Sequence, residues 1–280
     1  SRSNANKIRV TYENSDGFHL VDDFIMTGAN ILFASGGTGD DRMVVGNNVP
    51  YAVSLLGEGG DDYIAGGGCV GSLDGADDDD VVLGGGGDDT MNGGAGADQL
   101  DGADGNDTID GGAGADSIAG GNGNDVIDGG DDGDQIDGGA GSDIIHGGGG
   151  RDIVNGGAGD DVLEGGLGVD VLFGANGNDI LIAGAGGAGM HGEGGDDAMI
   201  SGTTSADSNN AALRTQIDAW GASAPGDFTT KQTNLLTSLS YAGNGVDDGM
   251  TGGEGRDWFH RTGEDSPFRV TASDLDTRIV

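Results

Sequence analysis

A nine-residue unit repeats sixteen times without a change of length between Gly57 and Ile200, and this period restricts the fold more than any other feature. The eighth residue of every unit is apolar. The sixth is aspartate except at Gly71 and Ala188. A nonapeptide period predicts a solenoid built from very short strands. The apolar positions are Ile64, Leu73, Val82, Met91, Leu100, Ile109, Ile118, Ile127, Ile136, Ile145, Val154, Leu163, Leu172, Leu181, Met190 and Met199.

Each unit divides into a glycine-rich turn and a short strand such as Thr108-Ile109-Asp110. Side chains alternate along a strand, so the apolar middle residue faces the core and its mostly polar neighbours face outward. Two units complete one coil and place one strand in each of two parallel sheets. Collagen would need glycine at every third residue, and a disordered linker would not hold an apolar residue in register. We therefore expect an all-β parallel β-roll, a β-solenoid with two nonapeptides per coil.

The aspartates indicate what stabilises a core that has only one aliphatic side chain per nine residues. Aspartates eighteen positions apart, such as Asp107 and Asp125, would lie above one another on one edge of the coils, where their charges repel. A hard divalent cation between stacked carboxylates removes the repulsion, and turn carbonyls complete its oxygen shell. Oxygen ligands without His or Cys favour Ca²⁺ over zinc or copper, and Mg²⁺ fits less well because it demands octahedral geometry.

The aspartates divide between two edges, and pairing neighbours along both edges predicts roughly a dozen calcium ions. One edge carries Asp89, Asp107, Asp125, Asp143, Asp161, Asp179 and Asp197. The other carries Asp62, Asp80, Asp98, Asp116, Asp134, Asp152 and Asp170. Asp41, Asp248 and Asp257 hold the same position in repeats outside the sixteen units. Binding should be weaker around Gly71, where the aspartate is missing.

The pattern G-G-x-G-x-D-x-U-x, in which U is apolar, resembles the RTX (repeats-in-toxin, haemolysin-type) calcium-binding family. The resemblance covers most of the chain. It implies a parallel β-roll in which Ca²⁺ is held in the turns by aspartates and by glycine carbonyls. The glycines that it assigns to the metal sites are Gly85, Gly87, Gly94, Gly96, Gly105, Gly112, Gly114, Gly121, Gly123, Gly130, Gly139, Gly141, Gly148, Gly150, Gly157, Gly159, Gly166, Gly168 and Gly177.

The resemblance also implies a cellular context: a bacterial protein that is exported by type I secretion, is unfolded in the low calcium of the cytosol and folds outside the cell. Segments near Ile180 (DILIAG) and Trp258 (GRDWFHR) are similar to C-terminal modules of large secreted or cell-surface bacterial proteins. The chain lacks an initial Met and a signal-type apolar stretch, so we expect a processed product or a fragment.

The segments around the repeats are expected to close the roll. Residues 1–35 read as an N-terminal cap and residues 36–200 as the roll. Asp41 and Asp62 are separated by one coil plus three residues, so the loop through Pro50 should bulge without ending the roll. Residues 247–280 hold the final repeats and a C-terminal cap that could carry an export signal.

Residues 201–246 leave the repeat, and their apolar spacing predicts helices over 211–220 and 229–239. The outward-facing flanks Ile144, Val162 and Ile180 are apolar, which requires a cover or a partner. We expect the helical insertion to pack on this outer face.

Charge and the remaining polar residues limit the functions open to the chain. With 49 acidic against 11 basic residues, the formal net charge is −38, which favours cations over nucleic acid or anionic membranes as partners. No apolar run approaches the ~18 residues of a membrane span. The four histidines, His19, His146, His191 and His260, should not converge on a zinc site, and no nucleophile motif occurs. Cys69, the only cysteine, is expected to be an inert thiol.

These observations favour a non-catalytic, extracellular Ca²⁺-binding module whose folding is driven by calcium. It would act as a structural, adhesive or assembly element of a secreted or cell-surface bacterial protein, with self-association into surface or filament assemblies. The alternative is the C-terminal secretion and folding module of a type I-secreted enzyme whose catalytic domain is absent from this sequence. A polysaccharide-binding module is a third possibility, for which outward aromatic side chains are too few.

Overall fold

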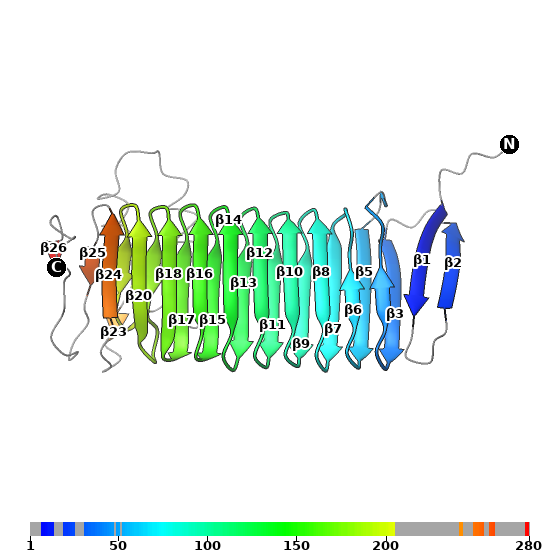
Figure 1. The fold of residues 1–280 in the computed structure, drawn as a ribbon, viewed down its shortest axis with the longest axis horizontal. Coiled ribbons are helices and arrows are strands. Elements are labelled where there is room, and N and C mark those ends of the chain that lie inside the picture. Colours follow the sequence, from blue (N-terminus) through cyan, green and yellow to red (C-terminus); the bar gives the residue numbers. More distant parts are fainter. Residues whose placement is uncertain are drawn as a thin grey trace. The chain divides into compact units, whose positions relative to one another are not determined.

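The computed structural model describes residues 7–13, 19–25, 31–47, 49–50, 52–204, 241–242, 249–254, 258–260 and 278–279. These residues form strands and turns, with no helix among them and hence none that could cross a membrane. The chain divides into two compact units, Ser1–Asp131 and Asp132–Val280. Each unit is a parallel β-solenoid (Figure 1), as the nonapeptide period predicts. The helices expected over 211–220 and 229–239 lie outside the described residues.

The first unit has two sheets, which we call sheet I and sheet II. Its sheet I has the order β2-β1-β4-β6-β8-β10-β12, and its sheet II has the order β13-β11-β9-β7-β5-β3. The strands of sheet I are β1 (Lys7–Glu13), β2 (His19–Ile25), β4 (Arg42–Val44), β6 (Tyr63–Ala65), β8 (Val81–Gly86), β10 (Gln99–Asp104) and β12 (Ser117–Asn122). The strands of sheet II are β3 (Ile31–Thr38), β5 (Ala52–Gly59), β7 (Gly71–Asp77), β9 (Thr90–Ala95), β11 (Thr108–Ala113) and β13 (Val126–Asp131).

The second unit repeats the two-sheet pattern. Sheet I contains β14 (Gln135–Ala140), β16 (Ile153–Ala158), β18 (Asp170–Asn176), β20 (Ala188–Gly194) and β24 (Gly249–Glu254). Sheet II contains β15 (Ile144–Gly150), β17 (Val162–Gly168), β19 (Ile180–Ile182), β21 (Ala198–Ile200), β25 (Trp258–His260) and β26 (Arg278–Ile279). A separate antiparallel pair joins β22 (Thr203–Thr204) and β23 (Tyr241–Ala242).

The register confirms two nonapeptides per coil. Leu100 pairs with Ile118 in sheet I, and Ile109 pairs with Ile127 in sheet II, each eighteen residues on. Met43 pairs with Ile64, so the loop through Pro50 adds three residues to one coil without ending the solenoid, as expected. At the N-terminal end, β1 pairs antiparallel with β2 and β4. The assignment of residues 1–35 as a cap remains a prediction.

The core is the row of eighth-position side chains between the two sheets. All sixteen are at most 3 % exposed, which agrees with the alternation read from the sequence. Successive core residues stack in register along each sheet, because neighbouring parallel strands present the same repeat position. The turns at both ends of every strand are thereby held in register too.

One outer face of the second unit is also buried. Val162 and Ile180 are each 2 % exposed although they point away from the core, and Ile144 is half-buried. Ile153, on the outer face of sheet I, is 48 % exposed by contrast. The face of β17 and β19 is therefore covered. That residues 201–246 supply the cover remains a prediction, since most of that segment lies outside the described residues.

Candidate metal sites on the two edges of the coils

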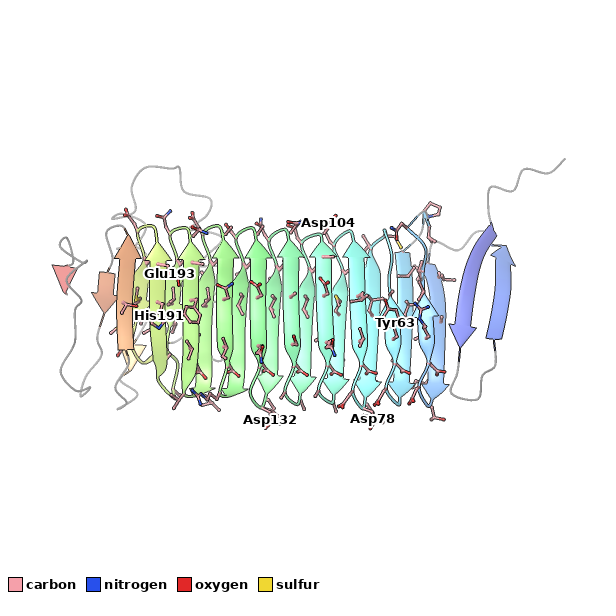
Figure 2. The ribbon with its side chains drawn as sticks, in the orientation of Figure 1. Tyr63, Asp78, Asp104, Asp132, His191 and Glu193 are labelled. Carbon is pink, nitrogen blue, oxygen red and sulfur yellow. The ribbon has the colours of Figure 1, made fainter. Side chains whose placement is uncertain are left out.

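Turns line two edges of each solenoid unit. We call edge 1 the turns that lead from sheet II to sheet I, and edge 2 the turns that lead from sheet I to sheet II. Asp78 lies on edge 1 and Asp104 on edge 2, at opposite ends of the strands in Figure 2. Glycine is required here by close approach: a Cβ on Gly85, whose φ is +102°, would lie 2.0 Å from the carbonyl oxygen of Gly67.

The sixth-position aspartates turn inward from both edges and form what we call the inner ladder. Each is at most 3 % exposed. On edge 1, Asp62 donates its backbone N–H to Oδ1 of Asp80 at 2.8 Å. On edge 2, Asp161 donates to Oδ1 of Asp179 at 2.9 Å. The same bond, between an aspartate and the next one along its edge, also joins Asp41–Asp62, Asp80–Asp98, Asp89–Asp107, Asp98–Asp116, Asp107–Asp125, Asp134–Asp152, Asp143–Asp161, Asp152–Asp170 and Asp179–Asp197.

In nine inner-ladder aspartates the second carboxylate oxygen is left without a protein donor. The structure buries the Oδ2 atoms of nine aspartates with no hydrogen-bond partner, although a buried charged oxygen requires one. A proton or a cation can satisfy such an atom. The nine residues are Asp62, Asp80, Asp89, Asp98, Asp107, Asp152, Asp161, Asp170 and Asp179.

Backbone carbonyl oxygens lie close to these carboxylates beside the first glycine of the nonapeptides. The point where a Cβ would stand on Gly174 lies 2.5 Å from Oδ2 of Asp179 and 2.9 Å from the carbonyl oxygen of Gly192. At Gly84 the corresponding distances are 2.6 Å to Oδ2 of Asp89 and 2.8 Å to the carbonyl oxygen of Gly102. Carboxylate and carbonyl oxygens from successive coils therefore share a space that any side chain would fill.

This donor set fits a calcium ion. Ca²⁺ takes carboxylate and carbonyl oxygens in flexible geometry, and the inner ladder offers both at every coil. Within the described ranges, no three His, Cys, Asp or Glu side chains gather at one point, so a bound cation would take part of its shell from the backbone. Carboxylates and carbonyls are a poor match for zinc or copper.

Burial makes the inner-ladder carboxyls hold protons more tightly than usual. Desolvation raises the pKa of Asp80 and Asp89 to about 7 and that of Asp179 to about 8, outweighing the backbone N–H bonds that lower it. The pKa of Asp62 and of Asp161 rises to about 6 for the same reason. Neighbouring aspartates add to the rise by repulsion. Near neutral pH these carboxyls are therefore poised to exchange a proton for a cation.

The sequence reasoning located the aspartates but overlooked the first-position glycines. Carbonyls of first-position glycines such as Gly102 and Gly192 lie beside the Oδ2 atoms of the inner ladder. The fourth-position glycines assigned by resemblance also come close, because the point where a Cβ would stand on Gly105 lies 2.1 Å from the carbonyl oxygen of Gly87 and 2.8 Å from Oδ1 of Asp107. The sequence does point to the first-position glycines, since glycine holds the first position of every nonapeptide from Gly57 to Gly192 except at Ala183. The ligand roles of all these residues remain predictions.

Other candidate residues lie apart from the inner ladder. Gly71, on edge 2, donates its backbone N–H to Oδ1 of Asp89 but offers no carboxylate. Ala188 interrupts the row of aspartates on edge 1. Asp248 and Asp257 lie outside the described residues. Cys69 points its thiol at the carbonyl of Gly66 at 3.6 Å, and burial raises its pKa.

The histidines occupy separate sites. Nδ1 of His146 on β15 lies 3.3 Å from Oε2 of the buried Glu164. His191, labelled in Figure 2, lies on β20. It stacks on Phe173 with ring centroids 5.0 Å apart, and its Nδ1 lies 2.7 Å from the Thr251 hydroxyl. The side chains of His19 and His260 are outside the described residues. His146 and His191 belong to different sheets.

Comparison with known proteins agrees with this geometry. Residues 51–68, 74–109, 101–136, 128–163 and 155–187 match the family model described as RTX calcium-binding nonapeptide repeat (4 copies). No curated protein matches the chain.

Proposed function

Because the repeats of this chain belong to the RTX calcium-binding nonapeptide repeat family, we propose that cations bound along both edges drive the folding of a structural module. The family is one of calcium-binding, non-catalytic repeats. The proposal adds where the ions bind and what they do to the fold.

One observation carries the proposal: the Oδ2 atoms of nine inner-ladder aspartates are buried and lack a protein donor. Leaving one such buried acceptor unsatisfied costs on the order of 1–3 kcal/mol, and more when it is charged. In the described part of the chain the cost recurs at almost every coil. A solenoid with so sparse a core depends on a counter-charge at these atoms.

The chain's own residues prepare the site in two ways. A backbone N–H from the preceding coil fixes Oδ1 of an inner-ladder aspartate, as Asp89 does for Asp107 and Asp161 does for Asp179, so Oδ2 lies beside the carbonyl of a first-position glycine. The first-position glycine keeps that space clear of side chains. Calcium, when bound, supplies the positive charge that offsets the repulsion between stacked carboxylates. Binding and folding are then a single equilibrium, as for other metal-dependent small cores.

We also propose that the module works outside the cell, in a secreted or cell-surface bacterial protein. Extracellular calcium modules bind at about 10⁻⁴–10⁻³ M, so the chain would stay unfolded at cytosolic calcium and fold after export. A structural, adhesive or assembly role is proposed for it, because the repeat family is one of structural calcium-binding modules. The exposed Ile153 on the outer face of sheet I offers one surface for self-association.

Circular dichroism tests the coupling of calcium to folding. In a chelator at pH 8 the chain should give the spectrum of an unfolded protein, and millimolar Ca²⁺ should restore β-structure. Mg²⁺ at the same concentration serves as the control and should restore much less, since it sheds water reluctantly. Full β-structure in the chelator at pH 8 would contradict the proposal. Isothermal titration would count the ions, and sedimentation with and without Ca²⁺ would test self-association.

A further inference from the structure

A second hydrogen-bond ladder runs outside the inner one, and we call it the outer ladder. It joins fifth-position residues, the neighbours of the inner aspartates, on edge 2 of the second unit. Asp160 accepts the backbone N–H of Asn178 at 2.9 Å, and Asn178 accepts that of Asp196 at 3.0 Å. The backbone N–H of Asp160 donates to the hydroxyl oxygen of Ser142 at 3.3 Å. A side-chain oxygen thus fixes the turn next to each inner aspartate on this edge.

The part of edge 1 that the structure describes through β20 in the same unit has no such ladder. The fifth-position residues there are Gly133, Arg151, Val169 and Gly187, and none of the four has a side-chain oxygen. Arg151 is exposed, and Val169 is 62 % exposed. The inner ladder is present on both edges, because the Oδ2 atoms of Asp152 and Asp170 on edge 1 are as buried and unpartnered as those of Asp161 and Asp179 on edge 2. Both edges of the described part of this unit therefore carry the same kind of candidate ligand, but only edge 2 has the outer ladder that holds its turns in place.

In the first unit, an outer ladder ends on edge 1 and another begins on edge 2. On edge 1, Asp61 accepts the N–H of Asp79 at 3.2 Å, and Asp79 accepts that of Ala97 at 2.8 Å, where the outer ladder ends because alanine has no acceptor. On edge 2 it begins at Asp88, which accepts the N–H of Asn106 at 2.9 Å. The outer ladder is thus a property of particular turns and not of the repeat as such.

Charge separates the edges in the same direction. On edge 2, Asp160 places a carboxylate directly before Asp161 and accepts the backbone N–H of Asn178, the neighbour of Asp179. On edge 1, the matching position before Asp152 holds the exposed cation Arg151, and that before Asp170 holds the uncharged Val169. A negative neighbour attracts a cation and a positive neighbour repels it. Ligand charge and site rigidity are the two factors that set calcium affinity in proteins.

We propose that the outer ladder makes two classes of calcium site, with edge 2 of the second unit binding more tightly than edge 1. Asp160 and Asn178 are positioning residues: they fix the turns that carry Asp161 and Asp179, so less ordering remains to be done when the ion binds. The inference rests on the proposed function, since it ranks the sites that function requires. At intermediate calcium, edge 2 is filled and edge 1 is not.

Calcium titration of the full chain by isothermal calorimetry tests this ranking. The wild-type chain should show a tight and a weak class. Asp160→Ala should weaken the tight class about fivefold to tenfold, because it removes one acceptor and one charge. Asp160→Asn keeps the acceptor and should weaken it less. Val169→Asn gives edge 1 the edge 2 pattern and should tighten the weak class. Arg151→Gln is the charge control on edge 1 and should leave the tight class unchanged.

The location of the tight class is read separately, from anomalous scattering of crystals soaked in limiting Tb³⁺. Density should occur first beside Asp161 and Asp179. Equal occupancy of both edges, or an unchanged tight class in Asp160→Ala together with an unchanged weak class in Val169→Asn, would overturn the ranking. Asp161→Asn and Asp179→Asn distinguish that failure from a failure of the proposed function: they lower calcium uptake if the inner ladder binds calcium, whichever edge is tighter.

Discussion

At the scale of the residue, the inner-ladder aspartate is a carboxylate whose two oxygens have different tasks. Oδ1 of Asp107 accepts the N–H of Asp89 at 2.7 Å, while its Oδ2 is buried beside the Gly120 carbonyl and has no donor. The first oxygen joins neighbouring coils of the folded protein and needs no cation to do so. The second is satisfied only when a proton or a cation is present, so it makes folding conditional.

Replacing Asp107 with Asn should separate these two tasks. The amide keeps an acceptor for Asp89 and places an N–H₂ donor near the Gly120 carbonyl, as a protonated carboxyl would. We expect the variant to lose calcium from the sites that Asp107 serves while gaining about 1 kcal/mol of stability in chelator. Asp107→Ala is the comparison and should lose both calcium and stability. Calorimetric stoichiometry measures the first effect, and the pH at which β-structure forms in chelator, followed by circular dichroism, measures the second; a full ion count in Asp107→Asn would contradict the ligand role.

At the scale of the element, the glycine-rich turn has positions of very different tolerance. In the turn that begins at Gly84, a Cβ on Gly84 would meet Oδ2 of Asp89 and the Gly102 carbonyl, whereas a Cβ on Gly86 would meet nothing closer than 3.6 Å. Neither residue has a positive φ. The two positions therefore differ in crowding, and neither requires a left-handed backbone.

Alanine substitution in this turn should show that difference directly. Gly84→Ala should cost on the order of 1–3 kcal/mol and reduce calcium binding on edge 2, because the methyl group occupies the space shared by the two oxygens. Gly86→Ala, the matched control, should change stability by less than about 0.5 kcal/mol. Calcium-dependent thermal unfolding measures both. Equal losses in the two variants would mean that glycine is needed for backbone freedom and not for the metal site.

The same turn shows how far sequence reasoning reaches. The period of nine fixes the coil length, the core row and the two rows of aspartates, because each depends only on which residues recur in phase. It says nothing about which carbonyl meets Oδ2 of Asp89, since every residue has one and only the turn geometry selects that of Gly102. The apolar outer flanks also predict that Val162 and Ile180 are buried, because an apolar outer face requires a cover, and both side chains are buried. What covers them depends on contacts between segments distant in sequence, which a local pattern does not encode.

At the scale of the whole molecule, the aspartates make stability depend on pH in a direction opposite to ordinary acid denaturation. Burial raises the pKa of Asp80, Asp89 and Asp179 to between about 7 and about 8 in the metal-free fold, against 3.8 for an unperturbed aspartate. The folded chain therefore binds more protons than the unfolded chain between these values. Stability from these groups is fully present below the unfolded pKa and is lost as pH rises through the folded values.

Metal-free protein should accordingly gain β-structure as the pH is lowered from 8 to 5, where protons replace cations on the inner ladder. Calcium affinity should fall over the same interval, because the ion then competes with bound protons. Circular dichroism in metal-stripped buffer and calcium titrations at pH 8, 7 and 6 follow the two effects. A metal-free chain that stays unfolded throughout, with calcium affinity independent of pH, would contradict this account.

The register described above also has a consequence for how such a chain can change in length. Strand residues in the repeats up to β19 pair with residues eighteen places away, as Val82 does with Leu100 and Met91 with Ile109, so gaining or losing eighteen residues there leaves each remaining residue with neighbours of the same kind. A change of nine would instead transfer all downstream strands to the opposite sheet. The loop through Pro50 accommodates three extra residues inside a turn. Duplication or deletion of a whole coil therefore preserves the pairing of the remaining strands, and such a chain can change its length during evolution in steps of one coil.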